Sequence, residues 1–301
     1  MKVLITGATG LVGKALRKRY AAQGVEVHFL STSSKKLQAA NGQGFYWNPA
    51  QGEIDHSALE GVTHIVNLAG ASIAQRWTPA NRKRILNSRV NSLKLLHQAI
   101  AKVQPSGLVH FLSASAIGRY PHSFTREYTE EVIEVDQSFL GEVVQAWEEA
   151  ADPFSQFDFS TCLLRIGIVL DPLEGALPKL VDPIKKGVGA PLGSGKQWQS
   201  WIHLEDLVGM ILFAQKTDWK GPYNGVAPEP VRQKQLTRAI DKTLNKPLWL
   251  PAVPPFALRL LLGEMAYIAL ASQQVSSAKA EQAGFVYRYP KLEPALQDLF
   301  S

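Results

Sequence analysis

Two spacings of hydrophobic residues alternate at the start of the chain. Residues 1–6 form a short apolar run, and apolar positions at Leu11, Ala15 and Leu16 then recur at helical spacing. Gly24 ends this segment, and a second apolar run follows at residues 25–30. Short apolar runs predict buried strands, whereas spacings of three and four predict a helix with one buried side. The segment is therefore predicted to be a strand, a helix and a second strand.

The same alternation continues to residue 170. Apolar runs at 61–70, 106–118 and 160–170 predict three further strands, the last nearly all apolar, as expected for a strand covered on both faces. Residues 77–103 predict a long helix that Thr78 caps and Pro79 opens. This order predicts an α/β fold, a Rossmann-like doubly wound parallel sheet with ligands at the carboxyl ends of its strands.

Beyond residue 170 the regular alternation is lost. We expect a helix near 177–186, a Gly/Pro loop at 187–195, a strand at 198–203 and a helix from 205. The apolar stretch 256–271 contains two charges and is too short to cross a bilayer, so it is interpreted as a docked helix. We predict a dinucleotide-binding domain at 1–170, to which 199–227 return, and an interleaved, smaller, mainly helical substrate domain at 171–301.

Composition narrows the function classes. Hydrophobic residues make up 46% of the 301 and charged residues 19%, which is typical of a globular enzyme. The net charge of +6 suits an anionic ligand such as a phosphorylated nucleotide, and it is too small to indicate nucleic acid. The single cysteine, Cys162, lies in an apolar run and predicts core packing, with neither a disulfide nor a metal site. No leader pattern precedes the first strand, so we expect a cytoplasmic protein that does not enter a membrane.

The first turn carries the clearest chemistry. Gly7, Gly10 and Gly13 form a GxxGxxG pattern between a predicted strand and helix. In such a loop the glycines permit a tight turn, a close approach of pyrophosphate and close packing of the helix, and the helix N-terminus favours the anion. The loop therefore predicts binding of a dinucleotide.

The end of the second strand predicts which dinucleotide is bound. An acidic residue there binds the ribose 2′-hydroxyl of NAD, but residues 31–36 contain none and offer hydroxyl and lysine donors to a 2′-phosphate. NADP(H) is thus preferred over NAD(H), although the same residues could serve only as a polar turn and helix cap. The candidate cofactor-binding residues are Gly7, Thr9, Gly10, Leu11, Val12, Gly13, Ser31, Thr32, Ser33, Lys35, Leu68, Ala69, Gly70, Ser113 and Arg165.

Several collinear motifs give the chain a recognisable resemblance. TGATGLVG, NLAG, the SASA strand, LLRIGIVL and GSGKQWQSWIHLEDLVGMI together resemble the extended short-chain dehydrogenase/reductase superfamily. More narrowly, the chain is similar to its "epimerase family" proteins, which bear a C-terminal extension of unknown function. The likeness runs end to end, through RWT at 76–78 and LLLGEMA at 260–266.

The resemblance implies a catalytic serine at Ser115, which would hydrogen-bond the reacting oxygen of the substrate. The superfamily usually adds a tyrosine four residues before a lysine on the following helix, as a general acid/base pair. Here that helix has Phe139 and Val143, which lack the hydroxyl and the charge. The narrower family generally lacks this pair too, so any redox or epimerase chemistry needs another proton carrier.

Tyr120 is the best remaining acid/base candidate. Relatives carry paired tyrosines after the serine strand, whereas this chain has Arg119 and Tyr120, and Arg119 could lower the pKa of the tyrosine. A glutamate common in relatives is Ala71 here, which weakens a role for an acid at that point. By the same resemblance the candidate lid residues over the substrate are Arg119, Lys196, Gln197, Trp198, Trp201 and His203, although a histidine at such a strand-to-helix junction more often caps or packs.

Two function classes remain open at this stage. One is an NADP(H)-dependent oxidoreductase or epimerase acting on a small polar substrate, in which Ser115 orients the substrate and Tyr120 or water moves the proton. The other is a non-catalytic nucleotide-binding regulator, possibly related to cell division. Homodimerisation through the helices at 79–103 and 136–151 would fit the superfamily.

Overall fold

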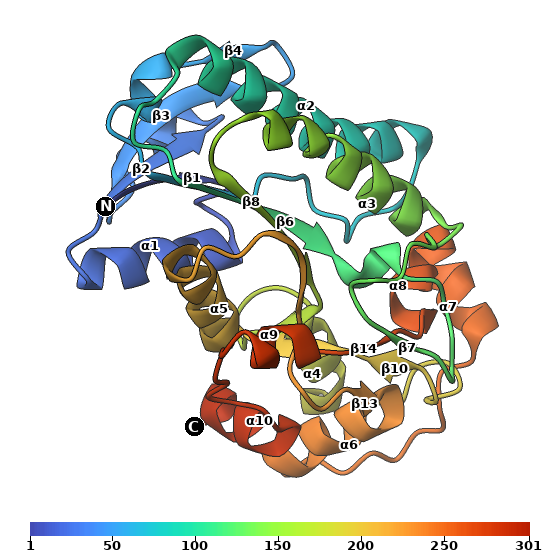
Figure 1. Cartoon of the computed structure of the whole chain (residues 1–301). Helices are drawn as coiled ribbons and strands as arrows, with labels where there is room; N and C mark the ends of the chain where they lie inside the picture. The colour runs from blue at the N-terminus through green and yellow to red at the C-terminus, as the bar shows by residue number, and fades with distance from the viewer.

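A computed structural model describes residues 1–301 and contains one eight-stranded sheet (Figure 1). Its strands lie in the order β12-β8-β6-β5-β1-β2-β3-β4. They are β1 (Lys2–Thr6), β2 (Glu26–Ser31), β3 (Gln43–Asn48), β4 (Glu53–Ile54), β5 (His64–Asn67), β6 (His110–Ala116), β8 (Ser160–Ile166) and β12 (Gly221–Gly225). All neighbours pair in parallel except β3 and β4. The predicted parallel sheet is confirmed.

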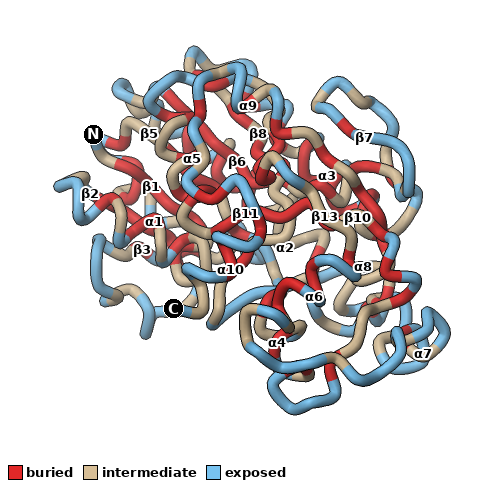
Figure 2. The backbone as a smooth tube through the Cα atoms, turned by 90° about the horizontal axis from the view of Figure 1, so that it is seen from below, coloured by how far each residue is buried: buried red, intermediate tan, exposed pale blue.

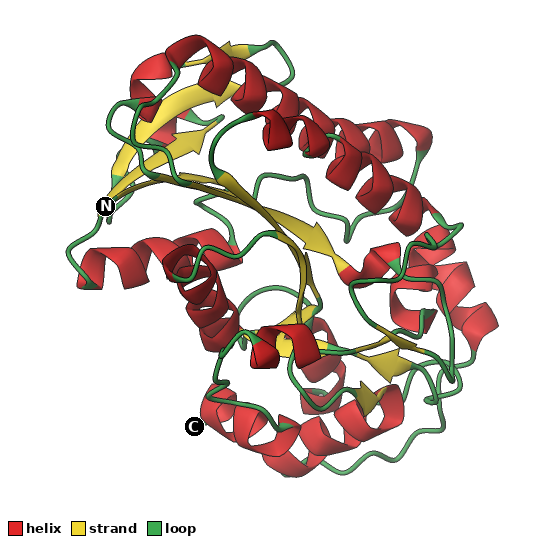
Figure 3. Ribbon diagram, in the orientation of Figure 1, coloured by secondary structure: helices red, strands yellow, loops and turns green.

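Helices cover both faces of this sheet (Figure 3). Helices α2 (Pro79–Val103) and α3 (Phe139–Glu149) cover one face, and α1 (Leu11–Ala22) and α5 (Leu204–Lys216) cover the other. Neighbouring side chains of β1 point to opposite faces, so Leu4 packs in the α2 core and Ile5 in the α1 and α5 core. The predicted cap on α2 is present, because Thr78 accepts the Asn81 N–H. Cys162 is fully buried in the α1 and α5 core, as predicted.

The predicted strand at 160–170 is in fact two strands. Strand β8 ends at Ile166, and β9 (Ile168–Leu170) leaves the main sheet to pair with β11 (Trp201–His203). Gly167 lies at the break, where a Cβ would come within 2.4 Å of the Ser200 carbonyl oxygen. This close approach of two backbones, which apolar periodicity does not reveal, separates the strands.

The remaining elements form a smaller layer at the carboxyl side of the sheet. Its helices are α4 (Leu177–Lys185), α6 (Gln233–Leu244), α7 (Pro255–Leu262), α8 (Tyr267–Leu270) and α10 (Leu292–Phe300). Helix α9 (Ala278–Gln282) instead packs against β12 and the core of α1 and α5. Two short ribbons join it to the rest: β10 (Trp198–Gln199) with β13 (Val231–Arg232), and β7 (Glu127–Tyr128) with β14 (Gln274–Val275). Helices α4, α6 and α10 share a third core around Leu236 and Trp201.

The apolar stretch 256–271 differs from the single docked helix expected for it. It is divided between α7 and α8 by Gly263, whose φ of +63° is unfavourable for other residues. Much of α7 lies at the surface (Figure 2), where Phe256 and Leu260 are exposed. No helix in the structure has both the length and the apolar character needed to span a bilayer.

Candidate functional site

The glycine loop between β1 and α1 has a backbone that requires its glycines. Gly7 has a φ of +65°, and a Cβ there would lie 2.5 Å from the Leu68 carbonyl oxygen. A Cβ on Gly13 would lie 2.4 Å from the carbonyl oxygen of Gly7. Any side chain at either position would therefore push the loop away from β5 or lift α1 from β1.

The first turn of α1 leaves several backbone donors free. The N–H groups of Leu11, Val12 and Gly13 have no acceptor in the protein, and the first intrahelical bond of this turn runs from Lys14 to Gly10. Gly10 is the N-cap and supplies no side-chain acceptor, and the first turn contains no acidic residue. Free N–H groups at the positive end of a helix suit a phosphate. The loop thus fits the diphosphate of a dinucleotide.

The end of β2 carries hydroxyl and lysine side chains and no carboxylate. The Ser31 hydroxyl is buried and exchanges hydrogen bonds with the Ser33 backbone at 3.1 and 3.2 Å. Thr32 and Lys35 are exposed, and Lys35 forms no ion pair. Of the four predicted residues, the donors available to a ligand are therefore Thr32, Ser33 and Lys35, because the Ser31 hydroxyl is occupied in shaping the turn.

A chain of polar side chains joins the carboxyl ends of three adjacent strands. Thr6 donates to Asn67 at 2.7 Å, and Asn67 donates to Ser113 at 3.0 Å. The backbone N–H groups of Leu68 and Ala69 both donate to the Thr6 hydroxyl at 3.1 Å. The predicted residues Leu68, Ala69 and Ser113 are thus fixed beside the glycine loop, and the Ser113 hydroxyl is used within the protein. Thr6 and Asn67 were not predicted.

A second polar cluster lies between β6, β8 and α3, and Glu148 is its centre. Ser115 donates to Glu148 Oε1 at 2.6 Å, and Arg165 donates to both carboxylate oxygens at 2.8 and 2.9 Å. Arg119 approaches the same carboxylate at 3.5 Å. Ser115 and Arg165 are buried and paired in register across β6 and β8. We call Ser115, Tyr120, Glu148 and Arg165 the buried network.

Tyr120 completes this network from within the protein. Its ring is fully buried, and its hydroxyl donates to Asn224 Oδ1 at 2.7 Å and accepts from Arg165 at 3.0 Å. Burial raises the pKa of Tyr120, and the lowering effect of Arg165 does not offset it. The expected lowering by Arg119 is not observed, because Arg119 points to Glu148 and Arg165 is the cation at the hydroxyl.

Sequence reasoning missed Glu148, although it lies on the helix that lacks the usual tyrosine and lysine. The missed signal is its position on the buried stripe of α3, which includes Gly141, Val144 and Glu148 at helical spacing. A glutamate on an apolar stripe needs a partner, because an unpaired buried carboxylate is costly. Its partner, Arg165, lies in another predicted strand, so the pair could not be assigned from periodicity.

A cavity of about 220 Å³ opens where β6 and β8 end, and we call it the strand-end cavity. Twelve of its 18 lining residues are hydrophobic. They include Ala116 and Ile166 of the strands and Val143 and Trp147 of α3. Arg89 of α2 is the one charged residue in this lining. Trp198 and Gln199 of β10 close the other side of this cavity. Trp198, one of the predicted lid residues, therefore lines it.

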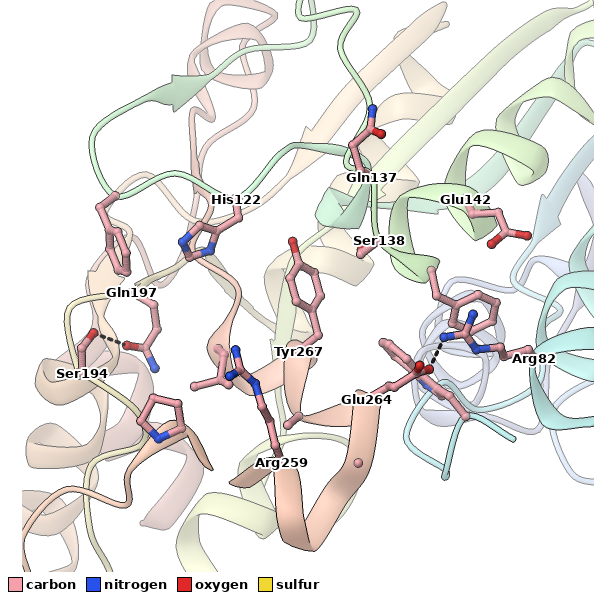
Figure 4. A pocket seen from close by; sticks show the side chains of 17 residues that line it. Arg82, His122, Gln137, Ser138, Glu142, Ser194, Gln197, Arg259, Glu264 and Tyr267 are labelled. Atoms are coloured by element: carbon pink, nitrogen blue, oxygen red, sulfur yellow. Dashed lines mark hydrogen bonds and ion pairs between the residues drawn. The ribbon is translucent and has the colours of Figure 1, made fainter. Parts of the chain in front are cut away.

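A larger cavity of about 960 Å³ lies on the other side of α8, and we call it the C-terminal cavity (Figure 4). Phe139 at the start of α3 lines it, together with Arg259 of α7 and Tyr267 of α8. Arg259 points into the space and has no ion pair, whereas Arg82 on the opposite wall pairs with Glu264. The Tyr267 hydroxyl donates to Asp136 at 2.7 Å. Burial raises the pKa of Tyr267, and the hydrogen bond to the Asp136 carboxylate raises it further. Glu142 also lines the cavity and has no ion pair, so unpaired charges of both signs are present and the cavity suits a polar group.

The remaining lid candidates separate into two groups. Gln197 lines the C-terminal cavity, and Lys196 is exposed nearby. Trp201 and His203 lie away from both cavities, since Trp201 is in the third core and His203 accepts the Glu205 N–H at 3.1 Å as the N-cap of α5. His203 also stacks on Tyr289 with ring centroids 4.1 Å apart. The capping and packing interpretation of this histidine is therefore confirmed.

Two family profiles match the chain. That of the NAD-dependent epimerase/dehydratase family matches residues 3–225, which include the glycine loop and the main sheet. That of a domain of unknown function, DUF1731, matches residues 253–299, which include α7 to α10. The C-terminal cavity lies between the parts of the chain that the two profiles cover.

Individual relatives match over nearly the whole chain. The "epimerase family protein YfhF" of Bacillus subtilis is 34% identical and covers 100% of this chain and 98% of its own. A chloroplastic homologue of the epimerase family protein SDR39U1 from Arabidopsis thaliana is 37% identical and covers 99% of this chain and 86% of its own. A crystal structure of human SDR39U1 (isoform 2) with NADPH is 29% identical, has a TM-score of 0.88 and covers 99% of both chains.

Proposed function

Because the chain belongs to the NAD-dependent epimerase/dehydratase family, we propose that it is an NADP(H)-binding oxidoreductase or epimerase-like enzyme acting on a small polar substrate. The observation that carries this proposal is the first turn of α1, with three unpaired N–H groups behind a loop that only glycine can form. The similarity to a human protein crystallised with NADPH supports the same cofactor.

The preference for NADP(H) over NAD(H) is part of this proposal. It is supported by the absence of any carboxylate from Ser31 to Lys36 and by the free ammonium of Lys35. A 2′-phosphate would add two negative charges beside these donors, whereas a bare 2′-hydroxyl would leave the lysine without a partner.

The two cavities would divide the substrate between them. The apolar strand-end cavity suits the reacting carbon, and the C-terminal cavity, with Arg259 and Glu142, suits a polar end. A bound nicotinamide would supply hydride chemistry. Ser115 lies next to Ala116 of the cavity lining, and its hydroxyl would have to turn away from Glu148 to orient the substrate oxygen. Tyr120 or a bound water carries the proton. The geometry favours water, because the Tyr120 hydroxyl already has two partners and its pKa is raised.

A second candidate is a regulator that binds the dinucleotide and turns nothing over. One observation favours it: every polar side chain of the buried network is already satisfied by another member or by Asn224. Phe139 and Val143 add no proton donor to the cavity walls. Such a protein would signal cofactor occupancy to a partner.

The test is a titration of NADPH and NADH into purified protein, followed by turnover of a panel of carbonyl compounds. We expect tighter binding of NADPH than of NADH and slow oxidation of NADPH by at least one compound. Ser115→Ala should lower kcat by about 100-fold without changing the Kd for NADPH, whereas Tyr120→Phe should lower it less than about tenfold if water carries the proton.

Each other outcome of this titration has a defined meaning. Tight binding without turnover by any compound would favour the regulator. A tenfold or larger loss in Tyr120→Phe, in protein that unfolds like the wild type, would instead identify Tyr120 as the proton carrier. Failure to bind either nucleotide would overturn both candidates.

A further inference from the structure

Arg89 of α2 is an arginine held without a carboxylate partner. Its Nη1 donates to the carbonyl oxygens of Ala71 and Ile85 at 3.1 and 3.0 Å, and its guanidinium lies 4.8 Å from the ring centroid of Trp147. Neither Nε nor Nη2 has an acceptor in the protein. The nearby arginines differ, because Arg82 and Arg165 each pair with a glutamate.

Arg89 is partly buried, which makes the lack of a counter-charge unfavourable for the protein alone. Burial lowers the pKa of Arg89 to about 10, although the group is still charged at neutral pH. Moving a cation out of water costs free energy unless hydrogen bonds or an opposite charge compensate. Two carbonyl oxygens compensate one nitrogen, and the other two nitrogens are left for water or for a ligand's oxygen atoms.

The position of Arg89 indicates where those oxygens come from. A Cβ on Gly70 would lie 3.0 Å from the Arg89 Cζ, and the Leu68 carbonyl two residues earlier contacts the glycine loop at Gly7. Arg89 also lines the strand-end cavity. It therefore lies between the glycine loop at the end of β1 and the cavity at the ends of β6 and β8. A dinucleotide that reaches from one to the other has to pass this guanidinium.

We propose that Arg89 is a cofactor-binding residue whose Nε and Nη2 bind oxygen atoms in the nicotinamide half of the dinucleotide. This inference rests on the proposed function, since it requires a dinucleotide on the glycine loop. It assigns a cation to the cavity that Val143 and Trp147 line, where α3 provides none. Guanidinium bonds to ribose and phosphate oxygens are among the stronger hydrogen bonds that proteins make.

The experiment compares two ligands on the same variants. Arg89→Met removes the charge and keeps an unbranched chain against Trp147, and Arg89→Lys keeps the charge. We expect Arg89→Met to weaken NADPH binding by about tenfold or more, with Arg89→Lys in between. Adenosine 2′,5′-bisphosphate, which lacks the nicotinamide half, should bind all forms equally. Lys94→Met, which removes an exposed cation from the same helix, should leave both affinities unchanged.

The outcomes separate this inference from the proposal on which it rests. If wild-type protein does not bind NADPH, the proposed function itself fails. If wild type and Arg89→Met bind NADPH equally, the role of Arg89 is overturned and the proposed function stands, even if the KM for a substrate rises. If Arg89→Met weakens the binding of NADPH and of adenosine 2′,5′-bisphosphate equally, the residue acts through the fold. The same conclusion follows if the loss of NADPH affinity is accompanied by a matching fall in the thermal unfolding temperature. Either result overturns the proposal.

Discussion

Two regions along the same edge of the sheet differ in how completely the protein itself satisfies their hydrogen-bonding groups. The glycine loop at residues 7–13 has three glycines and no charged side chain, and it leaves backbone N–H groups of the first turn of α1 unpaired. The buried network has charged and hydroxyl side chains, and each hydrogen-bonds to another. The loop therefore needs a ligand to complete its hydrogen bonds, whereas the network is complete without one.

This difference separates binding from stability. A change at Gly10, where a side chain has room, affects contacts that only a ligand makes, so it should alter affinity with little effect on folding. A change in the network leaves a buried charge or hydroxyl without its partner, so it should lower the free energy of unfolding. Arg89 is intermediate between the two regions in this respect, since the protein provides acceptors for its Nη1 and none for its Nε and Nη2.

The largest effect is expected from Glu148→Gln. The substitution leaves Arg165 and Arg119 without a counter-charge in a buried site, which should lower the free energy of unfolding by about 3–5 kcal/mol. Urea unfolding measures this. Glu149→Gln, one residue further on the exposed side of the same helix, is the control and should change it by less than about 0.5 kcal/mol. Equal effects of the two variants would mean that the network does not stabilise the fold.

Gly10→Asp tests the opposite behaviour. A Cβ at this position would be 3.4 Å from the Gly7 carbonyl oxygen, which is tolerable, and an aspartate is a favourable helix N-cap. Its carboxylate would repel the cofactor phosphates, so NADPH affinity should fall by about 100-fold or more. Fluorescence titration gives the affinity and thermal unfolding gives the stability. A variant that binds NADPH normally would remove the glycine loop as the phosphate site.

The amino ends of the strands provide a pH test away from both regions. Burial, and then the nearby His110, lower the pKa of His64 to about 4, below the roughly 6.5 of an unfolded chain. The unfolded chain therefore binds the proton more tightly, so stability is full above pH 6.5 and is lost as the pH falls toward 4. His64→Asn should show a smaller loss of the urea midpoint between pH 7 and 4. NADPH affinity at pH 7 should not change.

Lys35→Ala should give the smallest effect. Lys35 is exposed, so loss of its interaction with a 2′-phosphate should weaken NADPH binding by about threefold to fivefold and leave NADH binding unchanged. Lys36→Ala is the control on the adjacent residue. The ratio of the two Kd values measures the effect, and a ratio unchanged by Lys35→Ala would place the 2′-phosphate elsewhere.

Predictability differed between local and long-range features. The first strand, helix and strand, the cap at Thr78 and the core position of Cys162 follow from spacing within one segment, and all are confirmed. The break at Gly167 and the division at Gly263 were missed. The first depends on a backbone distant in sequence, and the second on one glycine conformation inside an apolar run.

The sequence by itself determined the parallel sheet and the glycine loop, because the hydrophobic period and the need for a missing Cβ act over neighbouring residues. Only the tertiary structure decided which polar groups meet. Glu148 and Arg165 come from a helix and a strand, and Arg89 meets Gly70 across a loop. Electrostatic and hydrogen-bond partners depend on distance in space and not on separation along the chain. The polar contacts at this edge of the sheet could therefore be assigned only from the folded structure.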